Sequence, residues 1–475
     1  MMRHQIFIIS LIILAGCASP DGPRPTPDRA TQSQLVDALF DQFTDQTQGC
    51  AVGVDYQGTV LHRAGYGMSD LEKNIPITPA SVFYTGSVSK QVVAMSAMIL
   101  VDQGKLDLDA PVGSYLPQLP AYADDITTRE LLHHTSGIRD FFVLLRLAGR
   151  FDEVVITEAM IMDILAQQKG LNFTPGSQYA YSNSAYFLIS QIVSALEGRN
   201  LDRFAQENIF DPLAMNDTLF QHDHKSPIAD MAHGHTPNPN GGYIRADVTL
   251  DVVGSGGMYS NIDDLIRWDR NFYENKLLGG QGVIDQMQST GRLNDGTATD
   301  YGFGLKLKPY RGLQQISHSG SLAGYRARLQ RFPEHRLTVA ILCNSSAAKP
   351  TKLANQITDI YLANYLAPAS AKNKQQARQI IRPALEAPKL AEYTGQFYSA
   401  EVDNVLTIEL GQESLWVRGI DGDGDHHLSP VSGDVFRRGK KGAHLVFVKD
   451  ANNNVSAFIY QGPRVSGIRF ERQEK

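Results

Sequence analysis

The chain has 475 residues, more than one hydrophobic core usually holds, so a large domain and a smaller one are expected. Its 44 basic and 50 acidic residues give a net charge of −6, and no basic patch stands out in the sequence. This balance gives nucleic-acid binding little support.

The first residues have the pattern of an export signal. Arg3 and His4 precede an apolar run over residues 6–14, which is too short to span a bilayer as a mature helix. The run ends in Leu14-Ala15-Gly16-Cys17, which resembles the lipobox of bacterial lipoproteins. The resemblance implies cleavage before Cys17 and lipidation of its thiol, and a simple secretory signal cut nearby is the alternative.

The residues after Cys17 bear on the location of the mature protein. Ala18 follows the cysteine, and no Asp is present there to signal retention in the inner membrane. The lipoprotein sorting pattern therefore implies an anchor in the outer membrane of a Gram-negative bacterium, facing the periplasm. After the signal segment 1–17, residues 18–32 are rich in Pro, Ser, Thr, Asp and Gly and are predicted to form a tether.

The central part of the chain, residues 33–366, has strand patterns at both ends and helical patterns between them. Residues 32–43 have helical spacing, and strand-like runs follow at 50–56 and 59–62. Strands from both ends would join one antiparallel sheet, with helices packed on it and a helical insertion between, which is an α/β (α+β) architecture. The strand-like runs near the C-terminal end of this part cover residues 302–308, 315–317, 326–332 and 337–343.

The last part of the chain has a different pattern. Residues 367–390 are rich in Ala, Lys, Gln and Pro and are predicted to be a linker. From residue 391 to residue 475, short alternating runs are separated by turns. This pattern is typical of a small all-β sandwich or barrel.

One apolar helix carries the first candidate for chemistry. From Ser87 to Gln103 the sequence is almost free of polar side chains, which predicts a buried helix. Ser87 and Lys90 are three residues apart at its first turn, so both side chains lie on one face. The helix dipole favours a neutral amine there, which could take the proton of Ser87 for attack on a carbonyl. The same pattern recurs at Ser346–Lys349, where we expect it only to open a surface helix.

Three short motifs follow one another in a specific order. They are Ser87-Val88-Ser89-Lys90, Tyr181-Ser182-Asn183 and His318-Ser319-Gly320. Together they resemble the serine β-lactamase and penicillin-binding protein superfamily, above all its class C-like branch with D-aminopeptidases and esterases, over roughly residues 35–365. The resemblance implies a β-lactamase/transpeptidase-like fold, with a lipocalin-like barrel at the C-terminus.

The resemblance also implies roles for the motif residues. Ser87 would attack an acyl carbonyl to form an acyl-enzyme, and the proton would go to Lys90 or to Tyr181, between which the sequence does not decide. Asn183 would orient Lys90 or the substrate amide. The supporting and oxyanion-binding groups implied are His318, Ser319 and Gly320, and the backbone N–H groups of Ser87 and Ser321.

His318 is a departure, because the family motif has lysine at this place. Histidine is mostly neutral at pH 7, so the site is expected to favour esters, amides or peptides without a free carboxylate. Arg326 and Arg328 share a strand face and could replace the lost charge, but a solvated face is the favoured interpretation.

Cysteine and histidine side chains outside the motifs allow two further hypotheses. Cys50 and Cys343 form either a disulfide or two buried free thiols. Two His-x-His pairs have the ligand type of a zinc site, although exposed loop and edge-strand positions are the favoured interpretation, and the serine mechanism requires no metal or cofactor. The pairs are His222/His224 and His233/His235.

The expected function is a lipid-anchored serine hydrolase that acts through an acyl-enzyme on an ester, amide or D-amino-acid peptide. A β-lactamase or penicillin-binding DD-peptidase is the alternative within the fold. A non-catalytic scaffold or binding protein on the same fold is the alternative from another class. The expected partners are a small-molecule or peptide substrate and, through Cys17, a membrane. The oligomeric state and the role of the C-terminal domain stay open.

Overall fold

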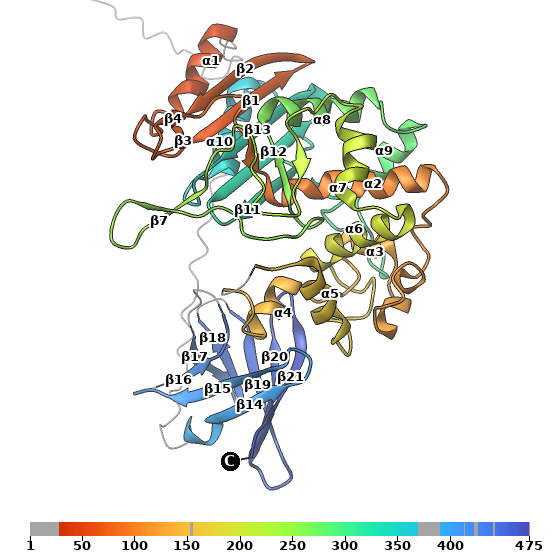
Figure 1. The fold of residues 1–475 in the computed structure, drawn as a ribbon, viewed down its shortest axis with the longest axis vertical. Helices are drawn as coiled ribbons and strands as arrows, with labels where there is room; N and C mark the ends of the chain where they lie inside the picture. The colour runs from red at the N-terminus through yellow and green to blue at the C-terminus, as the bar shows by residue number, and fades with distance from the viewer. Residues whose placement is uncertain are drawn as a thin grey trace, which may run out of the picture.

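The computed structural model describes residues 28–152, 155–368, 390–412, 414–421, 426–439 and 442–474. A larger body contains the sheet and most of the helices, and a narrower barrel lies at one end of it (Figure 1). The predicted lipobox with Cys17 and nearly all of the predicted linker lie outside the described residues. Within these ranges, every helix is too short or too polar to cross a bilayer.

A single antiparallel sheet organises the larger body. Its six strands lie in the order β10-β11-β12-β13-β1-β2, so strands from the two ends of this domain are neighbours. This confirms the predicted sheet. The strands are β1 (Cys50–Tyr56), β2 (Thr59–Tyr66), β10 (Lys306–Leu307), β11 (Ile316–Leu322), β12 (Tyr325–Phe332) and β13 (Leu337–Cys343).

Helices cover both faces of the sheet (Figure 1). On one face, α1 (Arg29–Ala38) and α10 (Pro350–Tyr361) bury apolar side chains against β1 and β13. The helix α8 (Ile262–Glu274) packs against the opposite face. The helix α1 begins earlier than the predicted 32–43, because the Asp28 side chain accepts a hydrogen bond from the N–H of Thr31 at 2.8 Å and caps the helix there.

The predicted nucleophile helix is buried but begins differently from the prediction. A short 3₁₀ helix, η1 (Gly86–Ser89), carries Ser87, and the α-helix α2 (Lys90–Asp102) starts only at Lys90. In α2, eleven residues in succession are buried, which confirms a core helix. It packs against α6 (Asn183–Glu197), which begins at the second motif and ends at Gly198 in the left-handed conformation.

The C-terminal domain is a closed barrel rather than a sandwich. Each of its eight strands pairs with its neighbours in the chain, and β21 pairs with β14 to close the ring. Alternate side chains fill the interior, including the buried rings of Phe397, Phe447 and Phe458. The strands are β14 (Gly395–Ser399), β15 (Asn404–Leu410), β16 (Leu415–Arg418), β17 (His427–Ser432), β18 (Val435–Arg438), β19 (His444–Lys449), β20 (Val455–Gln461) and β21 (Ser466–Arg472).

Cys50 and Cys343 form a disulfide, which decides between the two alternatives left by the sequence. The two residues lie directly opposite each other on the neighbouring strands β1 and β13. The bond thus joins residues 293 positions apart in the chain, the first residue of β1 and the last residue of β13. A cross-link of this separation restricts the unfolded chain and thereby stabilises the fold.

Candidate active site

The first motif brings a hydroxyl and an amine together. Lys90 Nζ lies 3.1 Å from Ser87 Oγ and donates further hydrogen bonds to Asn183 Oδ1 at 3.1 Å and to the carbonyl of Ser255 at 2.5 Å. The lysine side chain is fully buried, whereas Ser87 is half-buried at the edge of a cavity. The predicted pairing of Ser87 with Lys90 is therefore present in the structure.

Gly86 allows the segment before Ser87 to approach the third motif closely. Its φ is +54°, and a Cβ atom on it would lie 2.8 Å from the backbone nitrogen of Ser321. Only glycine fits without displacing the strand β11. The close approach brings the backbone of Ser87 beside that of Ser321. The N–H groups of these two residues are the ones predicted to bind an oxyanion.

Burial separates the proton affinities of the two candidate bases. It lowers the pKa of Lys90 to about 7. The Asp140 carboxylate opposes this shift by raising the pKa, and the charge of Arg464 lowers the pKa further. Burial raises the pKa of Tyr181, although a hydrogen bond with Ser87 and the charge of Arg464 act in the opposite direction. Near neutral pH a neutral amine is therefore much more accessible than a phenolate.

Aromatic and cationic groups surround the ring of Tyr181. Its centroid lies 5.1 Å from Lys90 Nζ, 5.2 Å from the guanidinium of Arg464 and 4.3 Å from the ring centroid of His134. The ring of His318 is 6.3 Å away. The second and third motifs thus meet the first, as predicted, around one buried cluster.

His318 is a neutral, buried side chain. Its Nε2 is 2.9 Å from the hydroxyl of Tyr301, and its Nδ1 is 2.8 Å from the carbonyl of Ser319. Burial and the neighbouring charge of Lys90 lower the pKa of His318 to about 3. The imidazole therefore does not replace the cation of the family motif, which agrees with the expectation from the sequence.

The burial of Arg328 contradicts the prediction that this side chain lies on a solvated strand face. It is 6% exposed and donates hydrogen bonds to Gln330 Oε1 at 2.9 Å, Gln315 Oε1 at 3.1 Å and Ser319 Oγ at 3.3 Å. Burial lowers its pKa only to about 10, so the guanidinium stays charged at neutral pH. Arg326 is half-buried and binds the backbone carbonyls of Ala323 and Tyr325. The prediction failed because periodicity identifies a shared face but not what packs on it.

Asp140 and Arg464 belong to the site but were not found from the sequence. Asp140 precedes the helix α4 (Phe141–Leu147), and its carboxylate accepts hydrogen bonds from both nitrogens of Asn183. Arg464 lies in the turn between β20 and β21 of the barrel, and its guanidinium lies 4.0 Å from Asp140 Oδ2. An Asp before an apolar run signals a helix cap, whereas no local pattern marks Arg464.

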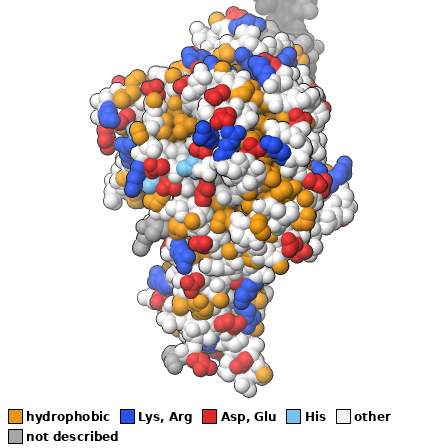
Figure 2. Space-filling model, turned by 45° about the vertical axis from the view of Figure 1, so that its right-hand side comes forward, with side chains coloured by type: hydrophobic (Ala, Val, Ile, Leu, Met, Phe, Trp, Pro, Cys, Tyr) orange, Lys and Arg blue, Asp and Glu red, His pale blue; other side chains and the backbone are white. Residues whose placement is uncertain are grey.

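A cavity of about 630 Å³ opens over these groups. Its lining combines apolar side chains with the basic side chains of Arg146, Lys306 and Arg464. Figure 2 shows hydrophobic side chains gathered over the lower part of the larger body, near the point where the molecule narrows to the barrel. The apolar residues that line the cavity are Phe141, Phe142, Val143, Phe151, Leu250, Val252 and Leu322.

The repeated motifs elsewhere have structural roles. The hydroxyl of Ser346 lies 2.9 Å from that of Thr236, just before α10, as expected for a segment that opens a helix. In Tyr259-Ser260-Asn261, a second copy of the Tyr-x-Asn pattern, Asn261 caps α8 through the N–H of Asp264 at 2.9 Å. Neither copy contributes to the cavity beside Ser87.

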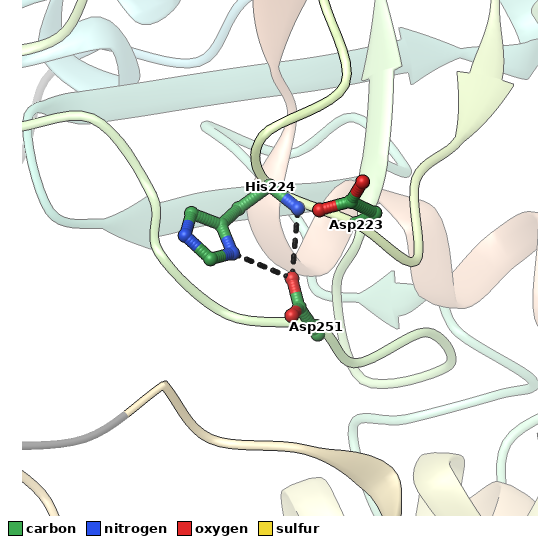
Figure 3. Close-up of side chains that lie close together, drawn as sticks. All are labelled: Asp223, His224 and Asp251. Carbon is green, nitrogen blue, oxygen red and sulfur yellow. Dashed lines mark hydrogen bonds and ion pairs between the residues drawn. The ribbon is translucent and has the colours of Figure 1, made fainter.

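The first His-x-His pair, His222/His224, is half-buried and paired with acids rather than exposed, which corrects the expectation of exposed loop positions. Burial lowers the pKa of His222, but Asp202 and Glu158 outweigh it and raise the pKa to about 9. Figure 3 shows His224 beside Asp223 and Asp251, and its Nδ1 is 2.8 Å from Asp251 Oδ1. Asp223 in turn accepts hydrogen bonds from the N–H of Lys225 and the hydroxyl of Ser226, so these groups already serve to hold their loop.

The second pair lies on and beside the short strand β7 (His235–Pro237). His235 is 7% exposed, and His233 lies 3.1 Å from Asp247 Oδ2. The edge-strand interpretation therefore holds for this pair, although the side chains are at least half-buried.

Several solved structures share this fold. The octameric penicillin-binding protein homologue from Pyrococcus abyssi aligns with 94% of this chain and 100% of its own, with a TM-score of 0.62 and 21% identity. The D-amino acid amidase from Ochrobactrum anthropi SV3 aligns with 70% of this chain and 98% of its own, with a TM-score of 0.58 and 21% identity. At this identity the likenesses establish the fold.

Sequence comparison places the chain in a family. The D-aminopeptidase of Gluconobacter oxydans (strain 621H) is 29% identical over 300 residues, which are 63% of this chain and 56% of that protein. The chain thus spans little more than half the length of this curated relative. A model of the Beta-lactamase family matches residues 36–362, which include all three motifs. These findings confirm the resemblance, and the chain belongs to the Beta-lactamase family.

Proposed function

We propose that this protein is a serine hydrolase that cleaves amide or peptide bonds through an acyl-enzyme on Ser87. The observation that carries the proposal is the contact of 3.1 Å between Ser87 Oγ and Lys90 Nζ. The pKa of this buried amine is lowered to about 7, which suits a general base that works near neutral pH. A nucleophile within hydrogen-bond reach of such a base is the arrangement that covalent acyl transfer requires.

The proposed reaction begins when neutral Lys90 accepts the proton of Ser87 and the hydroxyl oxygen attacks the substrate carbonyl. The N–H groups of Ser87 and Ser321 stabilise the oxyanion. Tyr181, protonated because burial raises its pKa, donates its proton to the departing amine and regains one from the Lys90 ammonium. Water then attacks the acyl-enzyme while neutral Lys90 takes one of its protons, and Lys90 passes this proton to Ser87 Oγ as the acid leaves, which restores the Ser87 hydroxyl.

The substrate class follows from the relatives and from the cavity. The D-aminopeptidase relative and the D-amino acid amidase fold favour an amide of a D-amino acid. The apolar residues that line the cavity suit a hydrophobic substrate side chain. Arg464 and Lys306 add positive charge there, so we revise the sequence-based preference for uncharged substrates and include substrates that carry a carboxylate.

Labelling with a fluorophosphonate probe, followed by peptide mass mapping, tests the nucleophile. We expect the probe on Ser87, no label after Ser87→Ala, and unchanged labelling after Ser346→Ala, which alters the repeated motif. A folded wild-type protein that stays unlabelled would favour a scaffold instead. Hydrolysis of D- and L-amino-acid amides of matched side chains then tests the substrate class, and a preference for L-amides would contradict it.

A β-lactamase or DD-peptidase activity is the second candidate. The charged side chains of Arg464 and Arg328 beside the site favour it, because β-lactams and peptide C-termini carry a carboxylate. Nitrocefin turnover or stable labelling by fluorescent penicillin would support it over the amidase proposal.

We further propose that the mature protein is lipid-anchored through Cys17 and faces the periplasm. The lipobox pattern supports this, and so does the Cys50–Cys343 disulfide, since such bonds persist in oxidising compartments. Expression in a Gram-negative host with a labelled fatty acid, followed by membrane fractionation, tests the anchor. Cys17→Ser should abolish both labelling and outer-membrane location.

A further inference from the structure

One buried carboxylate, that of Asp140, connects three parts of the molecule. It is 0% exposed, and its Oδ1 accepts a hydrogen bond from the N–H of Phe142 at 3.1 Å, which caps α4. Its Oδ2 accepts a hydrogen bond from the N–H of Asn183 at 2.8 Å, at the first residue of α6. The Ser182 side chain makes no capping bond to α6, so Asp140 caps both helices.

The same carboxylate fixes the orientation of the catalytic-site amide. Asn183 Nδ2 donates to Asp140 Oδ2 at 2.9 Å, and therefore Asn183 Oδ1 faces the other way, toward Lys90 Nζ at 3.1 Å. An amide rotated by 180° would turn its oxygen toward the Asp140 carboxylate and lose that hydrogen bond. The position of Lys90 beside Ser87 thus depends on Asp140, which acts on Lys90 through Asn183.

The barrel meets the active site at this residue. The backbone N–H of Asp140 donates to the carbonyl of Arg464 at 3.2 Å, and the Arg464 guanidinium lies 4.0 Å from Asp140 Oδ2. Asn172 holds the same turn by donating to the Arg464 carbonyl at 2.9 Å and by accepting from the N–H of Ser466 at 2.7 Å. Movement of the barrel turn would therefore act directly on the residue that orients Asn183.

We propose that Asp140 is a positioning residue that couples the barrel to proton transfer between Ser87 and Lys90. The proposal rests on the proposed hydrolase function and adds to it a role for the C-terminal domain. The barrel then does more than cover the cavity, because its Arg464 and the neighbouring Asp140 place opposite charges near the amine of Lys90. Removing either charge should change the pH at which the amine becomes neutral.

The charges around Lys90 determine the direction of each change. Asp140 raises the pKa of Lys90 and Arg464 lowers it, against the larger effect of burial. Asp140→Asn should therefore move the acid limb of the pH–rate profile to lower pH, and Arg464→Gln should move it to higher pH. The other titratable groups that face Lys90 are His134, which follows α3 (Thr128–His133), His318 on β11, Tyr181, and Tyr186 on α6.

The experiment measures the rate at which a fluorophosphonate labels Ser87 in the full-length protein between pH 5 and pH 9. Asp140→Asn should lower the maximum rate by about 100-fold, the size expected when catalytic groups lose their alignment. The matched control is Asp28→Asn, which alters the same kind of helix cap on α1, far from the site, and should label like the wild type. The acid limbs of Asp140→Asn and Arg464→Gln should move in opposite directions.

Each outcome bears on the proposal. If the wild type is labelled, and Asp140→Asn changes neither the labelling rate nor the acid limb, the positioning role of Asp140 is overturned. The hydrolase proposal would then stay intact. If Asp140→Asn lacks a cooperative melting transition, the folded variant Arg464→Gln tests the proposal instead. An acid limb of its pH–rate profile that is unchanged from the wild type would overturn the coupling. A wild type that does not label at all would instead contradict the proposed function itself.

Discussion

The contact between the barrel and the larger domain includes one buried ion pair, Arg139 with Glu401, whose removal can be tested. Arg139 donates to Glu401 Oε2 at 2.6 Å, and their side chains are only 5% and 10% exposed. Arg139 also donates to Gln168 Oε1 at 2.9 Å, and Glu401 Oε2 accepts from the N–H of Lys169 at 2.9 Å. Glu401→Gln would remove the negative charge and leave a buried guanidinium without its counter-charge.

Breaking a buried pair by removing one partner costs about 3–5 kcal/mol. Glutamine keeps the shape and one acceptor, so we expect the lower value of about 3 kcal/mol, or roughly a 150-fold shift toward the undocked barrel. The matched control is Glu409→Gln within the barrel, where the pair with Arg418 is 52% and 59% exposed and is worth only about 0.5 kcal/mol.

Differential scanning calorimetry of the full-length variants measures the effect. Glu401→Gln should lower the melting temperature or separate a barrel transition from the main one, and Glu409→Gln should leave the trace unchanged. Fluorophosphonate labelling should also slow in Glu401→Gln, because the turn that carries Arg464 is held by the same interface. Identical traces for both variants would refute the claim that this pair docks the barrel.

Three further outcomes are expected. Because neutral Lys90 is the proposed base and its pKa is lowered to about 7, kcat/KM should rise with pH and reach half its plateau near pH 7; a flat profile from pH 5 to pH 9 would contradict this. Tyr181→Phe should remove most activity toward amides, whose leaving group needs a proton, but less toward activated esters; equal losses would count against the proton-donor role. Replacing Cys50 and Cys343 by alanine should lower the free energy of unfolding by about 2–5 kcal/mol in chemical denaturation, and an unchanged midpoint would show that the cross-link contributes nothing.

The parts of the site that could be predicted are those with local spacing. Ser87 and Lys90 are three residues apart at the start of an apolar helical segment, and the motifs with Tyr181 and His318 carry their own short patterns. The antiparallel sheet followed from alternating apolar runs at both ends of the domain. In the barrel, alternation predicts the strands, but closure of β14 on β21 depends on long-range pairing, so the barrel is expected from the resemblance and not from alternation alone.

The parts that could not be predicted depend on contacts between distant segments. Asp140 and Arg464 are brought together only when the barrel docks on α4, and a turn containing one arginine has no periodicity to mark it. Arg328 is buried although alternation favours a solvated face, because alternation shows which residues share a side of a strand, whereas burial depends on what covers that side. The pKa of Lys90 likewise follows from the surrounding domain rather than from the helix dipole alone.

The most direct test of the account is intact-protein mass spectrometry during turnover of a slow amide or ester substrate. The account predicts a transient mass increase equal to the acyl group, mapped to Ser87 by peptide digestion and absent in Ser87→Ala. Turnover that proceeds at the same rate in Ser87→Ala, or an adduct on another residue, would contradict it.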